Sequence, residues 1–125
     1  MIFNSLNINN TILESAMQAA ALRNAVIANN ITNAETPGFK KSTVYFEESL
    51  QRALDAVSDK RNVDISQVKP VVQLMDRGYK YRIDENNVDI EQEMSALYQN
   101  GIKYDILANS VMNNYRRINL VLNAR

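Results

Sequence analysis

Three acidic residues near the start of the last third of the chain have the types and spacing that chemistry would need. Asp89, Glu91 and Glu93 alternate along one short segment, and paired carboxylates can act as general acid and base. Acidic residues are also expected at the start of any helix, because they complement the positive end of its dipole. A catalytic carboxylate would further need a cleft and a shifted pKa, which nothing in the sequence indicates. We therefore interpret the three residues as the first turn of a helix.

The segment 84–89, Asp-Glu-Asn-Asn-Val-Asp, resembles the start of a calcium-binding loop but departs from it at the positions that matter. Val88 stands at a ligand position, Asp89 replaces the turn glycine, and Ser95 stands where the bidentate glutamate belongs. The chain has 0 histidines and 0 cysteines, which excludes Ser-His and Cys-His nucleophiles and the usual zinc sites. The sequence therefore predicts no enzyme, no cofactor and no catalytic or metal-binding residue.

Composition limits the partners. The 125 residues carry a formal net charge of +0, whereas a protein that binds nucleic acid normally has a basic excess to meet the phosphates. No apolar run is long enough for a membrane-spanning helix, and the first residues lack the basic and apolar regions of a cleavable signal peptide. We expect no nucleic-acid partner, no membrane span and no cleaved signal.

A long helix is expected from Thr11 to about Asn33, with Thr11 and Glu14 forming a capping box. Alternating steps of four and three residues give a stripe that is apolar except at Asn24: Leu13, Met17, Ala20, Asn24, Ile27, Ile31 and Ala34. Thr36-Pro37-Gly38 should end the helix, because proline disfavours a helical residue before it and Gly38 can take the positive φ of a type II turn.

The middle of the chain reads as shorter elements. Residues 42–46 are β-branched and aromatic enough for an extended segment, and residues 46–58 have the spacing of a short amphipathic helix. Periodicity fades over residues 59–69, which predicts a mobile polar loop. Residues 71–75 and 79–83 are interpreted as a hairpin across Asp76-Arg77-Gly78.

The strongest pattern is the C-terminal helix, which Asp89 should cap. Its stripe is apolar or aromatic except at Gly101 and is typical of a coiled coil: Ile90, Met94, Leu97, Gly101, Tyr104, Ala108, Val111, Tyr115, Ile118 and Leu122. Gly101 is either a weak point or a place of close backbone approach.

The sequence thus predicts a mainly α fold, in which two long terminal helices form an antiparallel coiled-coil-like pair around a partly disordered middle. The middle would contain the short helix and the hairpin. We divide the chain into an N-terminal helix (1–36), a middle region (37–87) and a C-terminal helix (88–125). One pairing leaves an apolar face of each helix uncovered, which favours packing against other chains.

A cluster of asparagines, Asn29, Asn30 and Asn33, crowds the end of the first helix, where asparagine is a poor helix former. A C-terminal cap accounts for one of them. Polar residues on a buried stripe commonly set register or partner choice, which is the role we expect for the others.

The stretch Ala-Asn-Asn-Ile-Thr-Asn-Ala-Glu-Thr-Pro-Gly-Phe-Lys over residues 28–40 resembles the N-terminal signature of the flagellar rod and hook family of axial proteins. Within that family, Asn-Asn-Val-Asp-Ile-Glu-Gln-Glu-Met over residues 86–94, followed by Asn100 and Tyr104, is similar to a proximal rod member. The family pattern has Asp-Gly-Asn where this chain has Asp84-Glu85-Asn86, so we expect that turn to differ.

The resemblance implies a structural subunit of the flagellar basal-body rod, exported by the type III apparatus and assembled in the periplasm. It implies contacts with copies of itself, with FlgC-like rod proteins, with a FliE-like adaptor and with the base formed by the MS ring and export gate. It also implies subunit-interface roles for the signature residues Asn29, Asn30, Asn33, Thr36, Pro37, Gly38 and Phe39.

Two other interpretations remain at this point. A cytoplasmic coiled-coil adaptor or export chaperone would explain the stripes, but not the asparagine cluster joined to Thr-Pro-Gly-Phe. A small enzyme that uses carboxylates alone would need Glu91 or Glu93 in a catalytic role.

Overall fold

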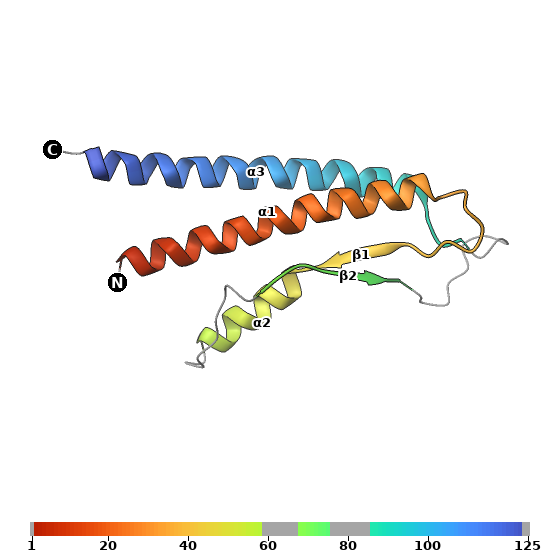
Figure 1. Ribbon diagram of the computed structural model, residues 1–125, viewed down its shortest axis with the longest axis horizontal. Helices are drawn as coiled ribbons and strands as arrows, with labels where there is room; N and C mark the ends of the chain where they lie inside the picture. Colours follow the sequence, from red (N-terminus) through yellow and green to blue (C-terminus); the bar gives the residue numbers. More distant parts are fainter. Residues whose placement is uncertain (1, 59–67, 76–85, 124–125) are drawn as a thin grey trace.

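The computed structural model describes residues 2–58, 68–75 and 86–123, and in this part the protein is mainly helical. Helix α1 (Ile2–Thr32) and helix α3 (Ile90–Asn123) lie antiparallel and side by side, with both chain termini at the same end (Figure 1). Strand β1 (Ser42–Tyr45), helix α2 (Glu47–Ser58) and strand β2 (Val71–Leu74) lie on one side of that pair. The predicted fold class, two long terminal helices packed against each other, is confirmed.

Helix α1 begins at Ile2, well before the predicted start at Thr11. Thr11 therefore lies inside the helix, and the predicted capping box at its side chain is wrong. The extra turns have a partner on α3, where Nδ2 of Asn114 donates to Oδ1 of Asn10 at 3.1 Å. Such a tertiary contact overrides a local start signal, because propensity alone is a weak guide to helix ends.

The turn after α1 has the form that the sequence predicts. The amide of Phe39 donates to the carbonyl of Thr36 at 3.2 Å, and Gly38 between them has a φ of 71°. Proline at the second position and a positive φ at the third are the marks of a type II turn.

The start of α3 is also as predicted. Oδ1 of Asp89 accepts from the amide of Glu91 at 3.0 Å and from that of Gln92 at 3.3 Å, so Asp89 is the cap. The helix continues through Gly101, where an added Cβ would meet nothing within 4 Å. Among the described residues, none therefore makes a close backbone approach at Gly101.

Strand β1 confirms the extended segment, but its pairing was not predicted. It pairs antiparallel with β2, Ser42 opposite Leu74 and Tyr45 opposite Val71. The expected partner of β2, residues 79–83, lies outside the described residues, as does most of the predicted polar loop. Helix α2 follows β1 directly, with the carbonyl of Phe46 accepting from the amide of Leu50 at 2.9 Å.

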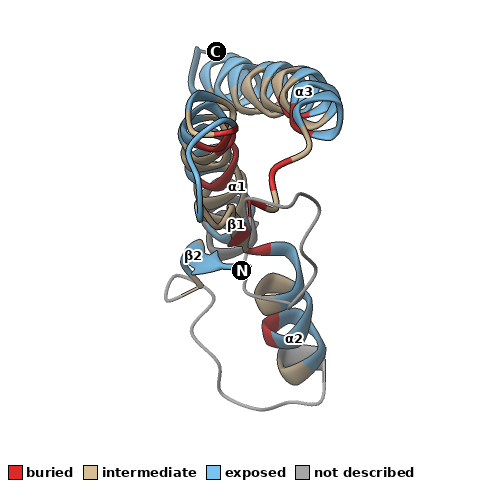
Figure 2. Ribbon diagram, turned by 90° about the vertical axis from the view of Figure 1, so that its right-hand side faces the viewer, coloured by how far each residue is buried: buried red, intermediate tan, exposed pale blue. Residues whose placement is uncertain are grey.

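The core is narrow. Its buried apolar residues lie on α1 and just after it, on β1, at and beside α2, and just before α3, whereas the buried residues of α3 itself are polar (Figure 2). The buried apolar residues are Ala19, Ala20, Ile27, Ala34, Val44, Phe46, Ala53 and Val88. Small side chains on α1 let α3 approach closely, so little volume is enclosed and much apolar surface stays outside. Within the described residues, no helix has the length and apolar character needed to cross a membrane.

Candidate functional site

The two asparagine-rich segments of the sequence meet in a buried cluster at the end of the helix pair opposite the termini. We call it the polar junction: Asn30, Lys41, Asn86, Asn87 and Glu93. Asn30 on α1 and Asn86 just before α3 are only 1% and 0% exposed. Buried polar groups are costly unless they are hydrogen-bonded, so the contacts of this cluster decide whether it stabilises the fold.

Asn30 joins α1 to β1 and α3. Its Oδ1 accepts from the amide of Ser42 at 3.0 Å, and its Nδ2 donates to the carbonyl of the same residue at 2.9 Å. Nδ2 also donates to Oε2 of Glu93 at 3.0 Å. The amide group thus takes the place of a neighbouring strand at the start of β1 and holds the carboxylate at the same time.

Asn86 joins the end of α1 to the start of α3. Its Nδ2 donates to the carbonyls of Asn33 at 3.1 Å and Thr36 at 2.8 Å, while its Oδ1 accepts from the amide of Val88 at 2.8 Å. Both carbonyls belong to the turn after α1 and also accept from backbone amides of that turn, so Asn86 fixes the segment before α3 against the turn.

Asn87 extends the junction to the sheet. Its Oδ1 accepts from the amide of Lys41 at 2.7 Å, and its Nδ2 donates to the carbonyl of Met75 at 2.7 Å. The neighbouring asparagines of the second motif therefore hold different elements, one the turn after α1 and the other the strand ends.

Glu93 is 7% exposed, and both its oxygens are engaged. Oε2 accepts from Asn30, and Oε1 lies 3.4 Å from Nζ of Lys41. Glu93 is buried whereas Lys41 is half-buried, so removing a partner of Glu93 leaves a buried carboxylate less well compensated and is destabilising. The arrangement suits a carboxylate that connects elements. Glu91 lies exposed in the first turn of α3.

The remaining signature residues form the outer side of this end. Asn33 closes the helix, since its Nδ2 donates to the carbonyl of Asn29 at 2.9 Å. Thr36 donates through its hydroxyl to Oδ1 of Asn33 at 3.3 Å. Asn29, Thr36, Pro37 and Gly38 are exposed, while Asn33 and Phe39 are half-buried.

A second ionic cluster was not predicted from the sequence. Arg23 on α1 donates to both oxygens of Glu47, at 2.9 and 2.7 Å, and to the carbonyl of Val44 at 3.1 Å. Lys103 on α3 also donates to Glu47, which is the first residue of α2. The hydrogen bond from Arg23 lowers the pKa of Glu47 to about 2. The only sequence signal was an acid at the start of a predicted helix, which names no partner.

The seam between α1 and α3, meaning the line along which the two helices face each other, contains further polar pairs. Nδ2 of Asn100 donates to Oδ1 of Asn24 at 2.7 Å and to the carbonyl of Ala20 at 2.8 Å. Asn10 and Asn114 form a corresponding pair nearer the termini.

The structure divides the predicted stripes between the seam and the outside. Members that are buried or half-buried in the single chain are Leu13, Met17, Ala20, Ile27, Ile31, Leu97, Tyr104, Ala108, Val111 and Ile118. Members that are exposed are Ile90, Met94, Tyr115 and Leu122. On α3 the seam passes through Glu93, Asn100 and Asn114, each one residue before a member of the predicted stripe. The pattern of apolar residues could not predict this one-residue difference between the stripe and the seam. The difference arises because polar residues of α1 pair with Glu93, Asn100 and Asn114.

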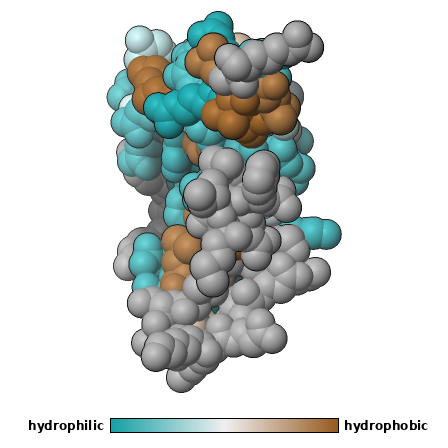
Figure 3. Space-filling model, turned by 90° about the vertical axis from the view of Figure 1, so that its left-hand side faces the viewer, coloured by the Kyte–Doolittle hydropathy of each residue, from teal (hydrophilic) through white to brown (hydrophobic). Residues whose placement is uncertain are grey.

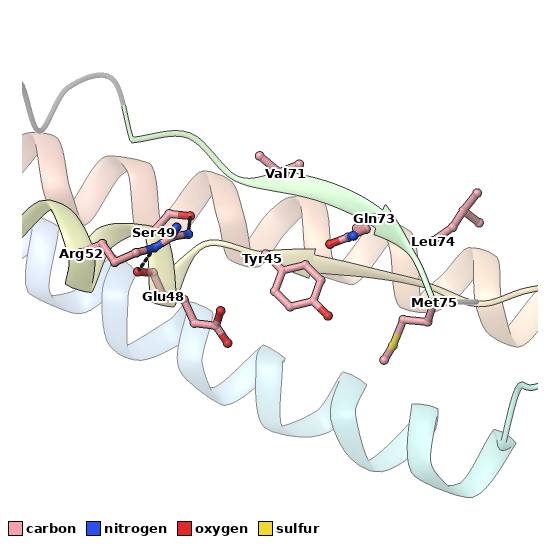
Figure 4. Close-up of a pocket in the computed structure, with 8 residues that line it drawn as sticks. All are labelled: Tyr45, Glu48, Ser49, Arg52, Val71, Gln73, Leu74 and Met75. Atoms are coloured by element: carbon pink, nitrogen blue, oxygen red, sulfur yellow. Dashed lines mark hydrogen bonds between the residues drawn. The ribbon is translucent and has the colours of Figure 1, made fainter. Parts of the chain in front are cut away.

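Two hollows flank the sheet. One, of about 500 Å³, lies between the sheet and α2 (Figure 4), and the other, of about 250 Å³, lies between α1, β1 and α3. In the first, Arg52 turns back to its own helix and donates to the carbonyl of Glu48 and the hydroxyl of Ser49, both at 3.3 Å. The second is lined in part by Lys41 and Glu93, so it belongs to the polar junction.

Comparison with known proteins gives one family. A family described as flagella basal body rod protein matches residues 11–40. The flagellar basal body rod protein FlgB of Borreliella burgdorferi is 35% identical, covering 85% of this chain and 89% of its own. FlgB of Bacillus subtilis is 34% identical over 88% of this chain and 89% of its own, and FlgB of Aquifex aeolicus is 26% identical over 82% and 83%. The two asparagine-rich motifs that meet at the end of the helix pair are part of the sequence over which these relatives match. The chain therefore belongs to the FlgB family of flagellar basal body rod proteins.

Proposed function

We propose that this structural rod subunit assembles through the apolar faces of α1 and α3 that its own fold leaves uncovered. The observation that carries the proposal is a row of large exposed side chains along α3. They are Ile90, Met94, Tyr98, Ile102, Ile106, Met112, Tyr115, Leu120, Val121 and Leu122. The first five follow one another at four-residue spacing and so are neighbours on the helix surface, and exposed apolar surface of this kind is typical of an interaction site.

The last turns of α3 also carry exposed apolar side chains. Leu120, Val121 and Leu122 are each more than two-thirds exposed, at 72%, 73% and 71%. Figure 3, seen from the end where the termini lie, shows apolar side chains gathered over the upper part of the molecule, where α3 ends. A solvated end would carry polar residues at these positions, so burial by another subunit is the simplest account.

Contacts of this kind between unlike faces of successive subunits do not close on themselves unless the rotation between subunits happens to close. They build a helical tube, which is the shape that a rod requires. We infer that the ends of the terminal helices are partly disordered in the free subunit and become ordered when neighbours cover them.

The outer signature residues Asn29, Thr36, Pro37 and Gly38 are proposed as a further subunit contact, at the opposite end of the molecule from Leu122. These residues are exposed, whereas Asn30 is buried within the chain. A rigid type II turn supported by Asn86 presents them in a fixed shape, and little conformational entropy would then be lost on binding.

We further propose export by the flagellar type III apparatus and assembly in the periplasm, next to copies of the chain, FlgC-like rod proteins, a FliE-like adaptor and the MS-ring and export-gate base. No catalytic role is proposed. Glu93 has both oxygens engaged within the junction, and Glu91 stands at a helix start.

Cell fractionation tests this proposal against the coiled-coil adaptor or export chaperone. A rod subunit is recovered in purified basal bodies and is protected there from added protease. An adaptor stays in the cytoplasm. Recovery of the chain only in the cytoplasmic fraction of motile cells would overturn the proposal.

A further inference from the structure

The seam between α1 and α3 pairs polar with polar along its length. Asn30 meets Glu93 at 3.0 Å, Asn24 meets Asn100 at 2.7 Å, and Asn10 meets Asn114 at 3.1 Å. The α3 members follow heptad spacing, at positions 93, 100 and 114, against 30, 24 and 10 on α1. The pairs therefore form three layers along the antiparallel helices, which on α3 are one and two heptads apart.

A different orientation of α3 would bury more apolar surface. Successive residues of a helix are about 100° apart around its axis. Turning α3 by roughly half of that angle, about 50°, would move the centre of the seam along its surface. Met94, Gly101 and Tyr115 would then replace Glu93, Asn100 and Asn114 in the seam. The other members of the seam, including Leu97 and Tyr104, would stay in place. The hydrophobic effect alone favours this rotated orientation, which is the one that the apolar pattern of the sequence predicts.

The rotated orientation fails on α1. Asn24 would face Gly101 and Asn10 would face Tyr115, and both amides would lose their present partners at half-buried positions. An amide that loses its partner in a partly buried seam is costly, so each mismatched layer disfavours the rotated state by about tenfold in population.

The Asn24–Asn100 layer does not stabilise the fold as an apolar layer would. Asn100 is 4% exposed, and its Oδ1 has no hydrogen-bond partner in the part of the chain that the structure describes. A layer that leaves a buried acceptor unsatisfied costs free energy. Its contribution is selectivity, as with a single buried asparagine in a coiled coil.

We propose that the pairs Asn24–Asn100 and Asn10–Asn114 fix the rotation of α3 on α1 and so decide which apolar face of α3 stays outside. The polar junction holds the helices at one end only. The two asparagine layers extend that control toward the termini. The side chains whose exposure depends on this rotation are Met94 and Tyr115, which are 53% and 50% exposed. The use of this outer face in subunit contacts rests on the proposed rod function, whereas the control of the rotation does not.

The chain has 0 cysteines, so introduced thiols report the rotation directly. Met17 and Leu107 are one heptad from both asparagine pairs and therefore face each other across the seam. A protein with Met17→Cys and Leu107→Cys reads the observed orientation, and one with Met17→Cys and Ala108→Cys reads the rotated one. We expect intrachain disulfide formation under mild oxidation to be at least about tenfold faster in the first, because two mismatched layers disfavour the rotated orientation.

Asn24→Leu creates a mismatch and should lower that ratio of rates by roughly threefold or more, since one of the two layers then favours rotation. Adding Asn100→Leu removes the mismatch, and the ratio should return to its original value. Gln18→Leu, on the exposed side of α1, is the matched control and should leave the ratio unchanged.

Rescue by the second substitution separates orientation from simple stability, because two independent losses would add. The proposal is overturned if Asn24→Leu leaves the ratio unchanged, or if Asn24→Leu with Asn100→Leu shows no recovery. The pair Asn24→Ala and Asn100→Ala repeats the comparison without added bulk, should leucine prevent folding as judged by circular dichroism. All measurements use the isolated chain, so they stand whether or not rod assembly is the function.

Discussion

Nδ2 of Asn30 donates a hydrogen bond of 3.0 Å to Oε2 of Glu93, and this contact joins residues 63 positions apart in the chain. One residue belongs to each of the two sequence motifs. The bond brings the motifs together in space and places a carboxylate, an amide and Lys41 in one buried cluster.

Asn30→Ala should destabilise the protein by about 2–4 kcal/mol, because it leaves Glu93 and the start of β1 without their buried partner. Urea unfolding followed by circular dichroism measures the change. Asn29→Ala is the control at the adjacent exposed position and should change the free energy of unfolding by about 0.5 kcal/mol or less. Equal losses in the two variants would contradict the role of the junction.

Two glycines should respond to alanine with opposite signs. Gly38 has a φ of 71°, so Gly38→Ala should cost about 1 kcal/mol through backbone strain, although there is room for the methyl group. Gly101 lies in α3 with open space around it, so Gly101→Ala should stabilise the isolated chain by about 0.5–1 kcal/mol.

Thermal unfolding of both variants checks the signs. A motility assay then adds information on Gly101. If the stabilised Gly101→Ala chain still fails to assemble, the glycine serves close approach by a neighbouring subunit. If both substitutions shift the melting temperature downward, our account of Gly101 is wrong.

The Glu47 cluster should make stability depend on pH in the acid range. The pKa of Glu47 is lowered from 4.5 to about 2 by its hydrogen bond with Arg23, so the unfolded chain binds the proton more readily. The stabilisation is therefore complete above about pH 4.5 and is lost as the pH falls toward 2. Because the side chain is 49% exposed, solvent screening keeps the effect small.

Urea unfolding at several pH values between 5.5 and 2.5 tests this dependence, with these values chosen to span roughly the titration window. Glu47→Gln should flatten the profile, and Arg23→Gln should do so as well. A Glu47→Gln protein whose stability still falls with the full slope of the parent would assign the pH dependence to other groups.

Ile106→Asp should abolish rod assembly and motility without unfolding the subunit. Ile106 is 61% exposed in the single chain, so its replacement should change the free energy of unfolding by about 0.5 kcal/mol or less. A charge placed in an apolar subunit contact would be buried without a partner. Recovery of the variant in purified basal bodies, together with swimming in soft agar, is the measurement.

Asn109→Asp adds the same charge at a nearby exposed position of α3 that is not apolar. Cells carrying it should swim normally. A motile strain with Ile106→Asp would remove this face of α3 from the assembly surface.

Local signals predicted the local structure well. The type II turn at Gly38, the cap at Asp89 and the extents of α2 and β1 depend on neighbouring residues, and all appear in the structure as expected. The long helices were found because their stripes repeat over many turns.

What the sequence missed depends on contacts between distant residues. The pairing of β1 with β2, the early start of α1 and the Arg23–Glu47 pair each need a partner far along the chain. The asparagine cluster was recognised as unusual, but the division of labour between a buried Asn30, a capping Asn33 and an exposed Asn29 follows only from the position of the other motif.

The Arg23–Glu47–Lys103 cluster, with its exposed carboxylate, and the Lys41–Glu93 pair, with its buried carboxylate, should respond differently to ionic strength. At 0.1 M salt, charges at the surface are screened beyond about 10 Å, whereas buried pairs are affected much less. Side-chain exposure is 49% for Glu47 but 9% for Glu93. Added salt should therefore weaken the cluster at the start of α2 more than it weakens the ion pair of the polar junction.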